Sequence, residues 1–151
     1  MQISAKTDYA VRALLSLAAH APHRISAGVV VDEQKLPLKF IEGILGDLRR
    51  AGLVRTQRGV GGGYSLSRPA AEITLGAVLR AVDGPLAEVH GLRPDETSYS
   101  GAAVHLRDVW VAVRASLREV LDQTTVEQVL TGELPPHVRA LVDLPEAWLP
   151  R

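Results

Sequence analysis

The chain has 151 residues, of which 46% are hydrophobic, and its formal net charge is zero. It has no cysteine, which excludes disulfides, thiolate zinc sites, thiol nucleophiles and any cysteine-ligated iron–sulfur cluster, so we expect no cofactor. No apolar run approaches the roughly 18 residues that a membrane span needs, and the N-terminus lacks a signal-peptide pattern. We therefore expect a cytoplasmic protein that has no membrane partner and is built around one dominant core.

The charges are divided unevenly along the chain. Residues 1–70 hold ten Lys and Arg against five Asp and Glu, whereas residues 71–151 hold seven against twelve. A basic first half that meets phosphates and an acidic second half that does not would produce this split.

Three helices are predicted in the basic half. Residues 7–20 have apolar side chains at helical spacing, and Thr7 can cap this helix. Ser26 can cap a shorter helix that runs to about residue 35. Pro37 favours the start of a third helix, which Gly52 follows as a left-handed cap. The apolar face of the third helix is predicted to comprise Phe40, Ile41, Ile44, Leu45 and Leu48.

A β-hairpin is predicted directly after the third helix. Residues 53–58 and 64–67 have the composition of strands, and residues 59–63 include four glycines that suit a flexible tip. A Walker loop is excluded, because it requires Gly-Lys-Ser or Gly-Lys-Thr at the start of a helix. Two short helices followed by a hairpin predict a winged helix-turn-helix.

The acidic half is predicted to be helical with an irregular end. Thr74 can cap a fourth helix over residues 74–82, and residues 84–100 show no clear period. Residues 101–123 form a long predicted helix, 125–130 a short one, and the proline-rich tail is expected to be irregular. The long helix has an apolar stripe of period near 3.5, which comprises Leu106, Val109, Trp110, Val113, Leu117, Val120 and Leu121.

Several segments in order resemble the Rrf2 family of winged-helix regulators. They are residues 3–10 (ISAKTDYA), 38–42 (LKFIE), 48–54 (LRRAGLV), 58–64 (RGVGGGY), and 73–75 with 82–84. The resemblance covers residues 1–84 and implies homodimers that bind DNA; from residue 101 onward it extends only to architecture. It divides the chain into a DNA-binding domain (1–84), a loop (85–100), dimerisation helices (101–131) and an irregular tail (132–151). The fold class is thus mainly α with a small β-hairpin wing and a long dimerisation helix.

We expect DNA contacts from the third helix and the wing. Lys39 can donate to guanine or phosphate, and Glu42 can accept from cytosine, although a solvated helix face remains open for Glu42. Arg58 at the foot of the tip can enter a narrow minor groove. Arg49 and Arg50 serve either phosphate or the helix dipole. The full predicted set is Lys6, Leu38, Lys39, Glu42, Arg49, Arg50, Arg55, Gln57, Arg58, Gly61 and Gly62.

No metal site is expected, and only weak candidates exist. Sensing members of the family carry three cysteines in the loop before the long helix, and this chain has none there. Asp8 lies where some members supply a carboxylate ligand, but an acid also suits the first turn of a helix. His90 and His105 lack the tight spacing of a helical metal pair. Any small-molecule effector remains unknown.

The predicted function is a transcriptional regulator, most simply a repressor, that binds double-stranded DNA as a homodimer on a two-fold symmetric operator. The alternative is a regulatory subunit with a vestigial wing, which binds a protein through its long helix instead of DNA. No nucleophile with a base at useful spacing and no cofactor fingerprint supports an enzyme.

Overall fold

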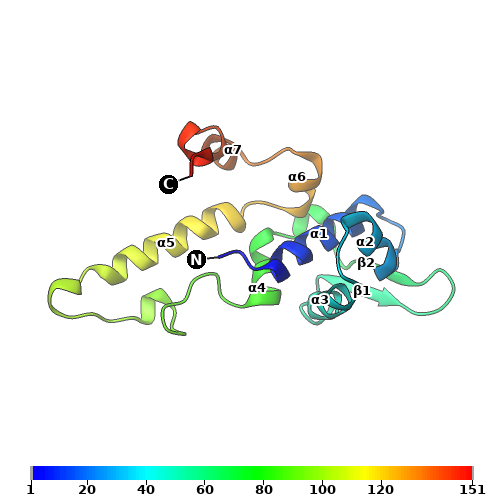
Figure 1. Ribbon diagram of the computed structural model, residues 1–151, viewed down its shortest axis with the longest axis horizontal. Coiled ribbons are helices and arrows are strands. Elements are labelled where there is room, and N and C mark those ends of the chain that lie inside the picture. Colours follow the sequence, from blue (N-terminus) through cyan, green and yellow to red (C-terminus); the bar gives the residue numbers. More distant parts are fainter. Residues whose placement is uncertain (1, 151) are drawn as a thin grey trace.

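The structure is a computed structural model that describes residues 2–150 (Figure 1). Its helices and strands are, in order, α1 (Ala5–Ala19), α2 (Ala27–Gln34), α3 (Leu38–Arg50), β1 (Val54–Gln57), β2 (Gly63–Leu66), α4 (Leu75–Asp83), α5 (Leu106–Leu121), α6 (Val126–Thr131) and α7 (Pro136–Val142). Short 3-10 turns lie at Ala70–Glu72, Pro94–Glu96, Gly101–Ala103 and Pro145–Trp148. This order confirms the mainly helical fold with a two-stranded wing. None of the described helices has the length and apolar character that a membrane span requires.

Side-chain caps set most of the helix starts. The hydroxyls of Ser26 and Thr74 accept hydrogen bonds from the backbone amides of Val29 and Ala77, as the sequence predicts. The prediction that Thr7 caps the first helix is wrong. Ser4 is the cap, and it accepts from the Thr7 amide at 2.9 Å.

Thr7 instead belongs to the interior. Its side chain is buried, and its hydroxyl donates to Asp83 Oδ2 at 2.6 Å. Ser4 donates to the same carboxylate oxygen, so the start of α1 is tied to the end of α4. Sequence alone could not separate Ser4 from Thr7, because both residue types are good caps.

The core lies where α1, α2, α3 and α4 meet the base of the wing. In α1 the fully buried positions are Ala10, Ala13, Leu14 and Leu17, and the alanines allow neighbouring helices to approach closely. α3 contributes Ile41, Ile44, Leu45 and Leu48, each at most 2% exposed. Because burial of one such aliphatic side chain is worth about 1.5–3 kcal/mol, this face of α3 holds the helix firmly in place.

The wing is a short antiparallel ribbon held at its base. Val54 pairs with Leu66, and Gln57 pairs with Gly63. Ile25, just before α2, exchanges two backbone hydrogen bonds with Tyr64 and so fastens the returning strand. A Cβ on Gly63 would lie 2.6 Å from the Ile25 carbonyl oxygen, which explains why glycine occupies this position.

The chain leaves the winged domain through residues 84–105, runs back along α5 and rejoins the domain at α6. Figure 1 shows α5 extending away from the cluster of helices, with residues 84–105 running alongside it. No residue of α5 is buried. By contrast, Val126 at the start of α6 is fully buried, and its amide donates to the Ile73 carbonyl at 2.9 Å. α6 therefore belongs to the same core as α1.

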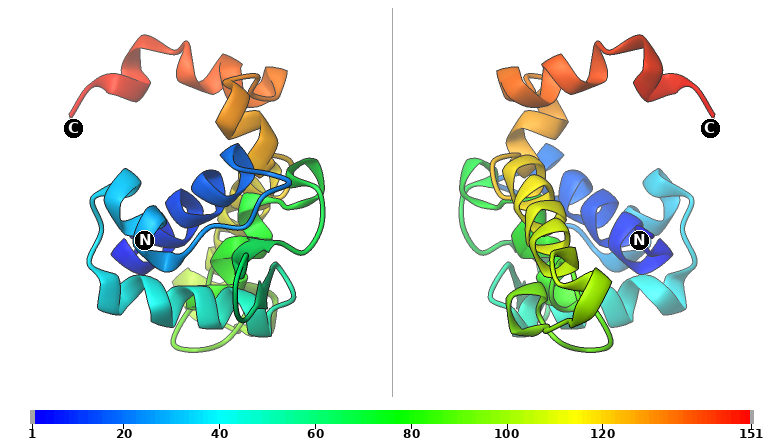
Figure 2. Two further views of the ribbon diagram at one scale, coloured as in Figure 1. Left: turned by 90° about the vertical axis from the view of Figure 1, so that its right-hand side faces the viewer. Right: turned by 90° about the vertical axis from the view of Figure 1, so that its left-hand side faces the viewer.

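Two sequence predictions about the C-terminal half are wrong. α5 is shorter than the helix predicted over residues 101–123, because a 3-10 turn at Gly101–Ala103 precedes it. The tail predicted to be irregular contains α7, in which Pro136 occupies the first helical turn, a position that suits proline. Val138 of α7 is 8% exposed, and Trp148 Nε1 donates to the Val142 carbonyl at 2.7 Å. Figure 2 shows residues 132–150 as an arc on one side of the molecule.

Candidate nucleic-acid interface

The N-terminal end of α3 projects from the core with its polar side chains free. Leu38 is 48% exposed, and Lys39 and Glu42 are also exposed. Within residues 2–150 neither Lys39 nor Glu42 forms an ion pair. Because the opposite face of α3 is committed to the core, these side chains are available to the edges of bases.

Phe40 was predicted to belong to the apolar core face, and this is wrong. It is 62% exposed and borders a cavity between α1 and α3 that Lys39 and Tyr9 also line. The core begins only at Ile41, so Phe40 lies in the first turn beyond the edge of the packed face. The one sequence feature that could have indicated the exposure of Phe40 is its position in the first turn of the helix. An exposed aromatic ring beside Lys39 adds an apolar contact surface of the kind that reads a thymine methyl group.

Lys6 and Arg50 both form ion pairs with the carboxylate of Asp47. Lys6 Nζ lies 2.7 Å from Asp47 Oδ2 and donates to the Val82 carbonyl at 2.9 Å. Arg50 forms a second ion pair with Asp47. The hydrogen bond from Lys6, ahead of the two cationic charges, lowers the pKa of Asp47 below its ordinary value. Asp47 therefore neutralises part of the charge that the sequence assigned to DNA.

Arg49 differs from Arg50 in that it is exposed and forms no ion pair within the described residues. It lies in the last turn of α3, where a cation also interacts favourably with the helix dipole. This position suits a contact with phosphate as well as the interaction with the helix dipole.

The wing presents its predicted residues on exposed surfaces. Arg55, Gln57 and Arg58 are all exposed, and Arg55 Nε donates to Ser65 Oγ across the ribbon at 3.3 Å. Arg58 follows β1 directly and has no ion-pair partner among residues 2–150. It therefore stands beside the tip with its charge free.

Glycine occupies positions 61 and 62 of the tip for two different physical reasons. Gly61 is exposed with a φ of +71°, a conformation that disfavours side chains. Gly62 is required by space, since a Cβ there would lie 2.3 Å from the Gln57 carbonyl oxygen. Val60 at the tip is fully exposed, and the sequence analysis did not single it out.

The weak metal candidates Asp8, His90 and His105 occupy three different parts of the chain. Within residues 2–150 no three His, Asp or Glu side chains gather as a metal site would require. Asp8 is in the first turn of α1 and pairs with Arg12 at 3.3 Å, which accounts for the acid there. His105 is the residue before α5, and His90 has a φ of +53° in the loop.

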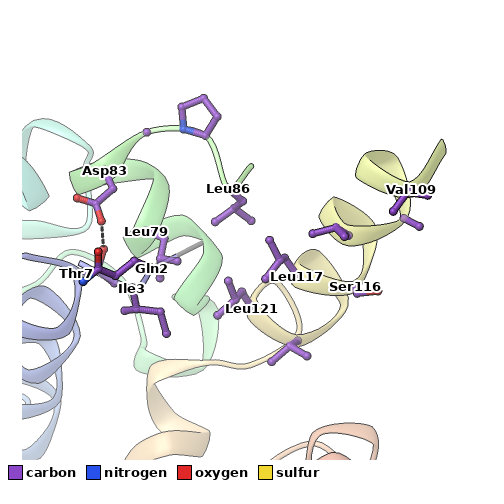
Figure 3. A pocket seen from close by; sticks show the side chains of 15 residues that line it. Gln2, Ile3, Thr7, Leu79, Asp83, Leu86, Val109, Ser116, Leu117 and Leu121 are labelled. Carbon is purple, nitrogen blue, oxygen red and sulfur yellow. Dashed lines mark hydrogen bonds between the residues drawn. The ribbon is translucent and has the colours of Figure 1, made fainter. Parts of the chain in front are cut away.

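The apolar stripe of α5 borders an open groove. Val109, Val113, Leu117, Val120 and Leu121 line it together with Leu79 of α4 and the segment before α1, around a volume of about 940 Å³. Figure 3 shows Leu117 and Leu121 directed toward the α4 side of this groove. Val109 and Val113 remain 52% and 39% exposed.

Trp110 and Leu106 are only partly buried. Trp110 borders a second cavity, formed with Pro94 and residues 87–90 of the loop, rather than the apolar groove. Its indole N–H is buried without a hydrogen-bond partner within residues 2–150. The predicted stripe is therefore divided, and Trp110 packs on the loop side of α5.

Known proteins are similar to this chain in sequence. A family model described as "Rrf2: Iron-dependent Transcriptional regulator" matches residues 3–132. A Mycobacterium tuberculosis protein predicted to be a helix-turn-helix transcriptional regulator is 45% identical over 144 residues, covering 95% of this chain and 89% of that protein. The regulator CymR of Bacillus subtilis is 32% identical over 130 residues, covering 85% of this chain and 89% of CymR.

Solved structures agree with this sequence similarity. The structure of CymR, the global cysteine regulator of B. subtilis, superimposes with a TM-score of 0.74 at 30% identity, covering 87% of this chain and 98% of that one. A structure of IscR from T. potens gives a TM-score of 0.67 at 29% identity, covering all of this chain and 93% of that one. The exposed α3 end, the glycine-tipped wing and these matches together show that the chain belongs to the Rrf2 family of winged helix-turn-helix DNA-binding transcriptional regulators, which are not enzymes.

Proposed function

We propose that the protein is a homodimeric, sequence-specific repressor that binds a two-fold symmetric operator. The observation that carries the DNA-binding geometry is that Lys39 on α3 and Arg58 beside the wing tip are both exposed and, among residues 2–150, form no ion pair. Two cationic side chains on neighbouring elements can reach the major and the minor groove on the same side of a DNA duplex.

In this proposal α3 reads the major groove. Leu38, Lys39 and Glu42 lie within its first two turns, the part of a recognition helix that contacts base edges. Lys39 donates to guanine O6 or N7, and Glu42 accepts from cytosine N4. The exposed ring of Phe40 provides the apolar contact beside them.

The wing supplies affinity rather than base readout. Arg58 enters a minor groove, where narrow A·T-rich tracts concentrate negative potential. Because Gly61 and Gly62 carry no side chain, the backbone of the tip approaches the phosphates closely. Arg55 and Gln57 precede Arg58 on β1.

The homodimer is supported by the exposure of α5. A 16-residue helix with no buried residue presents its apolar stripe to water, and such surface is normally covered in a stable protein. A second copy of the same helix is self-complementary to it, since a two-fold interface brings one patch to its own image. We propose that Leu106, Val109, Val113, Leu117, Val120 and Leu121 form that interface, with Trp110 at its loop edge.

A two-fold dimer requires a two-fold operator. Sequence selection from a random duplex library is therefore expected to return an inverted repeat with half-site centres separated by about 10 bp or a multiple of it. Addition of the protein to run-off transcription from a promoter that contains this repeat should lower transcript yield. If no sequence is enriched, the protein does not recognise DNA specifically, and the alternative regulatory-subunit function is favoured.

A further inference from the structure

A second surface of the protein gathers four arginine side chains around one small cavity. Arg80 comes from α4, Arg93 from the loop, and Arg114 and Arg118 from α5. Residues 84–87 complete the wall, and the cavity has a volume of about 310 Å³. Three separate segments of the chain thus direct like charges at one space, an arrangement that is unfavourable without compensating anions.

Arg114 holds the loop against α5, and Arg93 forms ion pairs within the loop. Arg114 lies 2.5 Å from Asp95, and its side chain is only 14% exposed. The hydrogen bond from Arg114 lowers the pKa of Asp95 below its ordinary value. Arg93 contacts both Asp95, at 3.2 Å, and Glu96, at 3.1 Å. The loop therefore places its cations and carboxylates at fixed positions beside α5.

The charge of a third arginine, Arg80, is neutralised by a carboxylate at the end of α5. Arg80 pairs with Asp122 at 2.7 Å. Asp122 can approach α4 this closely because residue 76 is glycine, where a Cβ would lie 1.8 Å from the carboxylate oxygen. Arg118, one turn before Asp122, forms neither an ion pair nor a side-chain hydrogen bond within residues 2–150.

The charges around the cavity therefore do not balance. Four guanidinium groups face three carboxylates, those of Asp95, Glu96 and Asp122, which leaves one positive charge, and no carboxylate lines the cavity itself. Guanidinium groups present fixed pairs of N–H donors that match the oxygens of carboxylate and phosphate groups. The volume lies at the lower end of the range for small-molecule sites, which suits a compact ligand and not a duplex.

We propose that this cavity is a binding site for a small oxyanion, a metabolite that carries a phosphate or carboxylate group. Arg118 is the primary partner, and Arg80 and Arg93 supply the flanking donors. The ligand contacts α4, the loop and α5 at once, so its binding stiffens the junction between the winged domain and α5. This site differs from the DNA-binding surface, and its occupancy does not require DNA.

Calorimetric titration of the free protein tests this proposal, with inorganic phosphate and succinate as separate probes at constant ionic strength. We expect one saturable site per chain for at least one probe. Phosphate binding alone assigns phosphate compounds, and succinate binding alone assigns carboxylates. Arg118→Gln should weaken binding about 10- to 100-fold, as expected for a lost charge-assisted hydrogen bond. It should leave the fold intact, because the Arg118 side chain is exposed and has no ion-pair partner in the described part of the chain.

Arg107→Gln is the matched control, since Arg107 is an exposed arginine on the same helix outside the cavity. It should bind the probe as the wild type does. The proposal fails if neither probe saturates, if Arg118→Gln binds as the wild type does, or if both variants lose affinity equally. It also fails if Arg118→Gln weakens duplex DNA binding and leaves probe binding unchanged, because the arginine would then contact the DNA backbone.

Discussion

Replacement of Val109 and Val113 by glutamate should convert the protein from a dimer to a monomer. The two side chains are 52% and 39% exposed, so together they leave close to one whole valine surface in water. Burial of a valine is worth about 1.5–3 kcal/mol, and a two-fold interface contains each residue twice, which amounts to about 3–5 kcal/mol per dimer. At 1.4 kcal/mol per factor of ten, loss of this burial weakens the dimer by about 100- to 5,000-fold.

The introduced carboxylates enlarge the effect. Each unpaired charge that the interface would desolvate costs several kcal/mol more. The helix itself should survive, because glutamate has a higher helix propensity than valine. The double variant is therefore expected to keep its circular dichroism spectrum and to behave as a monomer.

Light scattering coupled to size-exclusion chromatography at about micromolar concentration measures this outcome. Ala115→Glu is the control, because Ala115 is exposed and lies outside the groove. It should remain dimeric. A wild-type monomer, or a double variant that stays dimeric, would show that α5 does not form the interface.

Two further predictions concern the wing and the joint between α1 and α3. Gly62→Ala places a Cβ 2.3 Å from the Gln57 carbonyl oxygen, so the tip must shift, and thermal unfolding should report a loss of about 1–3 kcal/mol together with weaker DNA binding. Gly61→Ala, with open space around it, should cost only the roughly 1–2 kcal/mol of its left-handed backbone; equal losses in the two variants would contradict the steric reason. Asp47 has a lowered pKa in the folded state, so its contribution to stability is present above about pH 4 and is lost as the pH falls through the folded value. Urea unfolding from pH 6 to pH 3 should therefore show a steeper loss for the wild type than for Asp47→Asn, and parallel curves would contradict it.

Features that depend on local chemistry were predictable from the sequence. The caps Ser26 and Thr74 stand just before apolar periodic segments, and the glycines of residues 59–63 mark the wing tip. The family could be identified because its short motifs occur in the same order in this chain. Each motif consists of residue types with a local role, such as a helix cap or a turn glycine. The exposure of the α5 stripe also followed from its length, which exceeds what a small winged domain covers.

Features that depend on tertiary contacts were not predictable. Lys6 and Arg50 read as DNA-binding cations, yet both meet Asp47, and nothing in the sequence indicates that α1 delivers Lys6 there. Phe40 matched the apolar period of α3, but the buried face of the helix begins one residue later, at Ile41. The short helix α7 lies in a proline-rich segment whose few residues give no detectable period, and nothing in that segment marks Val138 as buried.

DNA-binding titrations of Arg58→Ala and Lys39→Ala at several salt concentrations test the central claim most directly. Arg58→Ala should weaken binding to the selected operator and to unrelated duplex alike, and should reduce the salt slope by about one charge. Lys39→Ala should lower the ratio between the two affinities, by an amount equivalent to about 1–3 kcal/mol. Arg107→Ala, on α5, should change neither quantity. If Arg58→Ala leaves operator affinity unchanged, the wing does not contact DNA, and the proposed mode of recognition is contradicted.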